Sequence, residues 1–457
     1  MNRYFTTTLL LLAGAWLAPV GCTSLDEVVD VDDPDIVNPG DLESVAGAVA
    51  AFTGGVGDFA LAIVGDNGGT EGQILVGGLM TDEYMHSGTF PTRLEYERRS
   101  INQNANGTLT GVARNLYRAR TSLEQSIGLL HTYVPPSPAT PANATRIGEA
   151  FALAGYTYIF FAETYCSGVP FSSATELGVA RTTDEILQLA IERFDSAFVY
   201  APSGSINNFA RVGKARALLN RGKSSFAAAA AIAAPVPLTF VYNTTHSTTT
   251  GRQQNGVHVF NHLSRRWSVA DNEGGNGLNF RSAGDRRVRV TADPVGGFDG
   301  TTPQFNLTKY PARTTPVPIG TGLEAKLIIA EALLDAGNVT AWLDTLNFLR
   351  ANARNLGFLG PADTTAADTL PPLPDPGTGV GRESLMFRER AFWLFATGHR
   401  LGDLRRLMRQ YGRLEDGVFP TGTHFKGDAY GNDVNVPVPP EELGNPNYTG
   451  GCSTTTP

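Results

Sequence analysis

The densest group of chemically active side chains lies near the C-terminus, in ERAFWLFATGHRLGDLRR at 389–406. Its main charged candidates are Glu389, Arg400, Asp403 and Arg406. They are compatible with acid–base catalysis, polyanion binding or a structural ion network. A catalytic pair needs a carboxylate held in a cleft with a shifted pKa, which no spacing here indicates. The two acidic residues would repel a polyanion. Since buried charges must be paired, we predict that the four residues form an ion network.

Two amphipathic helices must position these charges. Apolar residues recur at helical spacing over 385–396 and again over 401–411. The two helices are predicted to meet at 397–399, around Gly398. The four charged residues should then pair across this joint.

Helical spacing also marks the segments 147–165, 183–200, 212–233, 323–336 and 342–353. Their order of helix, short turn and helix, with small residues at the crossings, is typical of tetratricopeptide repeats, although no strict 34-residue period is visible. We therefore predict an all-α fold of tetratricopeptide-like helix pairs.

The helical pattern is interrupted between residues 236 and 322. Thr, Asn, Gly, Arg and aromatic residues dominate there, with strand-like stretches at 237–242, 286–291 and 305–310. Irregular segments this long are usually functional or disordered. We predict a loop-rich insertion with a few short strands and treat it as the candidate ligand face. It separates an N-terminal helical part, 41–235, from a C-terminal helical part, 323–457.

The N-terminus has the character of a bacterial lipoprotein leader. An apolar run at 9–20 is too short to cross a bilayer, which takes roughly 20 residues, and it ends just before Gly21 and Cys22. We predict a signal peptide at 1–21, a lipid anchor on Cys22 and an acidic tether at 22–40. An ordinary signal peptide with a chance cysteine is the alternative. No later stretch is expected to span a membrane, so the mature chain should be anchored rather than inserted.

The net charge bears on the class of binding partner, and the cysteine count bears on disulfide formation. The net charge of −8 and the pI of about 5.5 argue against nucleic acid. With Cys22 lipidated, Cys166 and Cys452 remain. Because exported proteins meet an oxidising compartment, we predict a disulfide between them, with two free thiols as the alternative.

Several segments resemble the motifs of one family. RESLMFRERAFWLFATGHRLGDLRRL at 382–407 is similar to the C-terminal signature of the RagB/SusD family. The segments at 148–171, 323–338 and 436–447 resemble other pieces of that family in the expected order, after the lipoprotein leader. The chain departs from the pattern at Gly402, where an aromatic residue is common, and in its cysteine pair.

The resemblance implies a nutrient-uptake lipoprotein of the outer membrane, displayed on the extracellular face. Such a protein acts as the lid of a SusC-like TonB-dependent transporter and captures an oligosaccharide or a peptide. It performs no chemistry and needs no cofactor. We therefore expect no catalytic residues, and the nucleophile-elbow, Walker and dinucleotide motifs are all missing from the sequence.

Glycan-binding members of the family use exposed aromatic rings, which suggests a ligand site around Trp267. Trp16 lies in the leader, and Trp342 and Trp393 lie on core faces of predicted helices, so Trp267 is the one Trp in a loop. The candidate ligand residues near it are Phe260, Asn261, His262, Arg266 and Asn272. Core packing or contact with the transporter is the alternative role for these side chains.

Tyr84, in the segment TDEY, is a second ligand candidate, although a structural role is the alternative. His258 and His262 have the spacing of helical metal ligands, but no acidic third ligand lies at a telling distance in sequence. No metal site is predicted.

Two other functions are compatible with the sequence. The chain could be a tetratricopeptide scaffold lipoprotein of the outer membrane, but a scaffold would not need a long aromatic-bearing insertion. A secreted hydrolase would need a pair of catalytic carboxylates, and nothing singles out two among the many present.

Overall fold

The computed structural model describes residues 39–173, 175–358 and 369–457. The predicted signal peptide at 1–21, the predicted lipid anchor Cys22 and nearly all of the tether at 22–40 lie outside the described residues. Helix α2 begins at Pro39, within the last two residues of that predicted tether.

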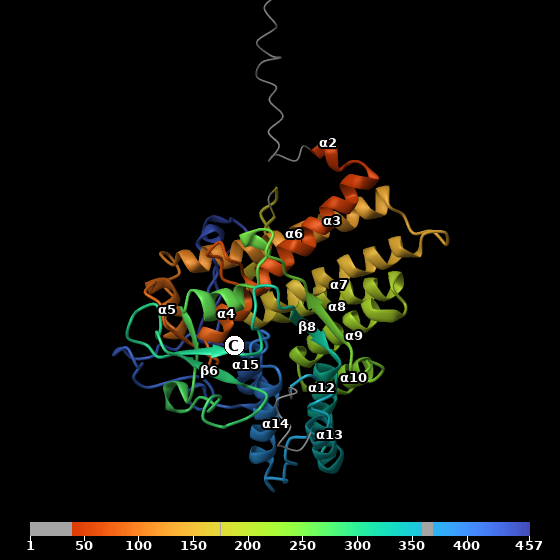
Figure 1. The fold of residues 1–457 in the computed structure, drawn as a ribbon. Helices are drawn as coiled ribbons and strands as arrows, with labels where there is room; N and C mark the ends of the chain where they lie inside the picture. Colours follow the sequence, from red (N-terminus) through yellow and green to blue (C-terminus); the bar gives the residue numbers. More distant parts are fainter. Residues whose placement is uncertain (1–38, 174, 359–368) are drawn as a thin grey trace, which may run out of the picture.

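The described chain is mostly helical, which confirms the all-α prediction. Successive helices pack against one another from α6 to α9, and α3 lies against α6, so they form the inclined stack of Figure 1. Helices α12, α13 and α14 extend below this stack. The helices are α2 (Pro39–Leu42), α3 (Val45–Val64), α4 (Gln73–Leu79), α5 (Pro91–Glu97), α6 (Gly107–Tyr133), α7 (Pro141–Thr164), α8 (Thr183–Tyr200), α9 (Gly204–Arg221), α10 (Phe226–Ala233), α11 (Gly256–His258), α12 (Gly322–Asp335), α13 (Val339–Ala351), α14 (Gly379–Trp393) and α15 (Arg400–Tyr411).

Local sequence explains where these helices begin and end. The Thr182 side chain caps the start of α8, and Glu185 reaches back to the Thr182 backbone, which completes a capping box. The predicted helical segment at 212–233 contains parts of two helices. It divides into α9 and α10 at Gly222, whose φ of 144° ends α9 in a conformation that other residues rarely adopt.

Small residues let the stacked helices approach closely. A Cβ atom on Gly155 of α7 would lie 2.7 Å from the Phe194 ring of α8. A Cβ atom on Gly213 of α9 would lie 2.3 Å from the same ring. Phe194 is fully buried, so the two glycines provide the space that it fills.

Helix α3 differs from the expectation that no later stretch reaches membrane-spanning length. Its 20 residues and mean hydropathy of 1.6 are sufficient to cross a bilayer, but half of the apolar window is buried inside the protein. Because α3 packs along α6, we interpret it as a core helix.

Within the described residues, the strands form four two-stranded antiparallel sheets. Three of these sheets use strands from the predicted insertion. The pairs are β1 (Tyr84–His86) with β5 (Trp267–Val269), β2 (Val169–Pro170) with β3 (Ala180–Arg181), β4 (Val241–Thr244) with β8 (Val317–Thr321), and β6 (Val290–Asp293) with β7 (Gln304–Leu307). The β1–β5 pair joins the insertion to the N-terminal helical part, and its register places His86 opposite Trp267.

A disulfide fixes the C-terminal tail to the helical body. Cys166 follows α7 and is bonded to Cys452, with a Cα–Cα distance of 5.2 Å. The tail is also held by the Val434 amide, which donates to the Thr454 carbonyl oxygen at 2.7 Å. Covalent and backbone bonds therefore place the tail against the end of α7.

Replacing Cys452 by serine should lower the free energy of unfolding by up to about 5 kcal/mol, because the bond closes a loop of 286 residues. Denaturant unfolding with and without a reducing agent measures the loss. A cross-linked peptide containing Cys166 and Cys452 is expected in a digest of the unreduced protein. Its absence, together with unchanged unfolding in reductant, would contradict the bond.

Candidate functional site

The joint between α14 and α15 is built around Asp403. The Asp403 carboxylate accepts hydrogen bonds from Arg390 at 2.8 and 2.9 Å and from Arg406 at 2.9 Å. Arg406 also pairs with Glu331 of α12. All four side chains are buried. Burial alone would raise the pKa of Asp403, but the two arginines hold it well below its usual range.

Two of the predicted network residues pair elsewhere. The structure pairs Asp403 with Arg406, but Glu389 accepts hydrogen bonds from Arg287 of the insertion at 2.7 Å and from Arg350 of α13 at 2.8 Å. The side chains of Glu389 and Arg390 point about 100° apart around the same helix, so they form ion pairs with different residues. The prediction that all four residues pair across the joint is wrong for Glu389.

The same correction applies to Arg400. Its guanidinium forms two hydrogen bonds to Asp82, at 2.6 and 2.8 Å. The next residue, Glu83, accepts the backbone N–H of Ala396 at 2.9 Å. Ala396 has a φ of 57°, which is unfavourable for alanine, so this contact helps to hold the strained turn. Burial raises the pKa of Glu83 to about 7.

The departure at Gly402 also has a structural cause. A Cβ atom there would lie 2.9 Å from the Glu163 carboxyl carbon. Glu163 pairs with Arg216 in the same buried region. A carboxylate–arginine pair therefore occupies the space in front of Gly402.

An asparagine at Asp403 should destabilise the fold by about 3–5 kcal/mol, because Arg390 and Arg406 would keep their buried charges without a carboxylate between them. Thermal and denaturant unfolding measure this loss. Asp375→Asn is a matched control, since Asp375 pairs with Arg382 at 2.7 Å on the surface. It should leave the unfolding curve nearly unchanged. Equal effects of the two substitutions would contradict the central role of Asp403.

The structure buries the centre of the predicted ligand site. Trp267 is fully buried, its indole N–H donates to the Leu75 carbonyl oxygen at 3.2 Å, and the Arg93 guanidinium lies 5.0 Å from its ring. The prediction that Trp267 offers an exposed ring is wrong, because β5 turns this side chain toward the core. Phe260 is buried against it, with the two ring centroids 4.8 Å apart.

Two other candidates also have structural roles. Asn261 is buried and donates to the Trp267 carbonyl oxygen at 2.6 Å while accepting the Leu307 amide at 2.7 Å. Tyr84 is fully buried in β1. As ligand residues both predictions are wrong for this structure, because neither side chain is accessible.

The remaining candidates lie closer to solvent. His262 stacks on His258, with ring centroids 4.6 Å apart, and binds the Leu307 carbonyl oxygen. Asn272 is exposed, with a φ of 54° at the start of η4 (Glu273–Gly275). Arg266 is partly exposed immediately before β5. Of the predicted ligand residues, Arg266 is the one that lies beside exposed aromatic rings.

Arg266 lies between two half-exposed phenylalanines. Its guanidinium is 5.2 Å from the Phe90 ring centroid and 4.3 Å from that of Phe298. The rings are 45% and 48% exposed. The loop that carries Phe298 is held beside β1 and β5 by two backbone hydrogen bonds. The Phe298 N–H donates to the Arg265 carbonyl oxygen, and the Asp299 N–H donates to the Ser87 carbonyl oxygen. We call this group the Phe90–Arg266–Phe298 surface.

Phe90 and Phe298 are not among the ligand residues predicted from the sequence. Phe90 stands directly before Pro91, at the start of α5, and Phe298 follows two glycines in a turn. Aromatic residues in such turns have little backbone around them to cover the ring, and this signal could have identified them. Apolar rings can stack on sugar C–H faces, and the arginine guanidinium between them can donate hydrogen bonds to hydroxyl groups.

A separate cavity of about 640 Å³ lies between the insertion and α12. Its volume is within the range of small-molecule sites. Lining side chains include Phe240, Lys309, Thr321, Glu324 and Phe358. Burial lowers the pKa of Lys309 to about 8. A small ligand fits this cavity by volume, so the cavity is a second candidate site, on the border of the insertion.

No protein-family model and no curated protein sequence matches the chain. Solved structures match its architecture. A SusD superfamily protein from Parabacteroides distasonis aligns with a TM-score of 0.65 at 12% identity, covering 88% of this chain and 98% of that chain. The chain has the SusD-like fold.

Other solved structures have the same SusD-like architecture. A SusD-like carbohydrate binding protein from Bacteroides vulgatus aligns with a TM-score of 0.58 at 16% identity, covering 79% of this chain and 83% of that chain. NanU from B. fragilis aligns with a TM-score of 0.58 at 13% identity, covering 92% and 100%. The SusD-like fold agrees with the arrangement that the sequence resemblance implied.

Proposed function

We propose that this SusD-like chain is a nutrient-binding lipoprotein of the outer membrane that captures an oligosaccharide at the cell surface. In this proposal Cys22 carries the lipid anchor, and the protein acts as the lid of a SusC-like TonB-dependent transporter. The SusD-like fold over nearly the whole described chain supports the proposal. One matching structure is described as a carbohydrate binding protein, which favours an oligosaccharide over a peptide.

The Phe90–Arg266–Phe298 surface is the ligand site that we favour. Its two rings come from different segments, α5 and the insertion, and the β1–β5 pair holds these segments together. A preformed pair of rings binds without the entropy cost of ordering a loop. Capture needs no proton transfer, so the proposal assigns no catalytic residue.

Alanine at Phe90 or at Phe298 should each weaken binding of a retained oligosaccharide roughly tenfold, because each ring contact contributes about 1.4 kcal/mol. A glycan array first selects the oligosaccharide, and titration calorimetry then measures its affinity. Phe348→Ala is the matched control, since Phe348 is also 48% exposed but lies on α13. Unchanged affinity in both site variants would move the ligand to the 640 Å³ cavity.

The transporter partnership has its own test. The tagged lipoprotein, isolated from its native outer membrane in mild detergent, should bring with it a large barrel with a plug domain in equal amount. Mass spectrometry identifies the partner. Recovery of membrane-assembly proteins instead would favour the scaffold function over nutrient uptake.

A further inference from the structure

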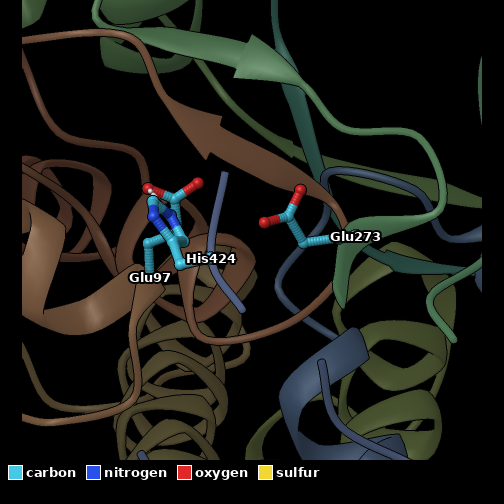
Figure 2. Close-up of side chains that lie close together, drawn as sticks. All are labelled: Glu97, Glu273 and His424. Atoms are coloured by element: carbon cyan, nitrogen blue, oxygen red, sulfur yellow. Dashed lines mark ion pairs between the residues drawn. The ribbon is translucent and has the colours of Figure 1, made fainter. Parts of the chain in front are cut away.

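Three buried side chains from distant segments meet in the interior of the protein. Glu97 ends α5, Glu273 begins η4, and His424 lies in the loop after α15. One carboxylate oxygen of each glutamate and one ring nitrogen of His424 lie within 4.8 Å of one another. Figure 2 shows Glu97 and His424 side by side, with the Glu273 carboxylate directed toward them.

The polar atoms of this cluster are poorly satisfied. Neither carboxylate oxygen of Glu97, which is 1% exposed, has a partner in full hydrogen-bond geometry among the described residues, although the His86 backbone approaches this carboxylate. Nε2 of His424 lies 3.2 Å from Glu97 but outside hydrogen-bond geometry. Glu273 accepts a hydrogen bond from the Tyr430 hydroxyl group. A buried carboxylate without a well-aligned donor is costly, so a bound cation would stabilise the cluster.

The neighbouring cations are already paired. Arg98 forms an ion pair with Asp428. Lys426 pairs with Asp299 at 2.8 Å and also donates to the His86 carbonyl oxygen. Within the described part of the chain, neither glutamate of the cluster has a lysine or arginine partner. Burial accordingly raises the pKa of Glu97 to about 8 and that of Glu273 to about 7.

We propose that Glu97, Glu273 and His424 bind a divalent transition-metal ion of the Zn²⁺ class. Two carboxylates neutralise its charge, and three protein ligands leave one position for water. The imidazole nitrogen distinguishes this set from a calcium site, which takes six to eight oxygen ligands. This proposal does not depend on the proposed nutrient ligand.

Binding requires a local rearrangement around His424. The backbone N–H of Lys426 donates to Nδ1 of His424 at 3.1 Å, so the neutral ring carries its proton on Nε2, facing Glu97. A metal at Nε2 displaces this proton. Nδ1 must then hold a proton, and the hydrogen bond from Lys426 opens. The ion therefore shifts the turn at 424–428 while joining it to α5 and the insertion.

The test uses the full-length protein, stripped with a chelator and supplied with Zn²⁺, Ca²⁺ or Mg²⁺ separately. Elemental analysis after gel filtration should find one Zn²⁺ per chain and neither of the other ions. Glu273→Gln and His424→Gln should each weaken Zn²⁺ binding by at least about tenfold. Glutamine at 273 keeps an oxygen for Tyr430, so this variant is expected to fold.

His262→Gln is the matched control, because His262 belongs to the separate stacked pair with His258. It should leave Zn²⁺ binding unchanged. Failure of the unaltered protein to retain Zn²⁺, loss of binding in the control instead of the site variants, or equal binding of Ca²⁺ would each overturn the proposal. Visible absorption of Co²⁺ in the unaltered protein tests the nitrogen–oxygen ligand set without any variant, and an octahedral aqueous spectrum would also overturn it.

Discussion

The pairing of buried charges is the constraint on which the rest of this structure depends. Asp403 lies between two arginines, and Arg406 continues the chain of contacts to Glu331, so these ion pairs fix the relative arrangement of helices α12, α14 and α15. If one helix shifted by one turn, several buried charged side chains would lose their ion-pair partners and remain in an apolar interior. Hydrophobic packing brings these helices together, and the ion pairs select the register.

The same constraint extends from the helices to the insertion. Arg287 of the insertion pairs with Glu389 of α14. Arg400 of α15 pairs with Asp82, which lies just before β1. The insertion has little regular structure of its own, since its strands are short and each sheet has two strands. Ion pairs with the helices therefore help to stabilise the conformation of the insertion, which a larger sheet would otherwise stabilise through strand pairing. The rings of Phe90 and Phe298 can remain exposed because other interactions hold their backbone.

Helix positions followed closely from the sequence, while side-chain partners did not. The spacing at 183–200 and the Thr-Asp-Glu start gave α8 its observed bounds, because capping and amphipathic packing are local effects. Trp267 was misjudged because a loop-like composition concealed a short strand that turns the indole inward. The partners of Glu389 and the meeting of Glu97 with His424 depend on contacts between residues far apart in the chain, which periodicity does not report.

The disulfide between Cys166 and Cys452 can form only after the C-terminal tail has been synthesised. Its two halves are separated by 286 residues, so in the exported lipoprotein that we propose the first thiol leaves the cell interior long before the second. Under that proposal Cys166 remains available for thiol–disulfide exchange throughout that interval. A chain that stops early keeps a reactive thiol at the end of α7. Completion of the tail removes it, so the oxidation state of this single residue distinguishes finished chains from truncated ones.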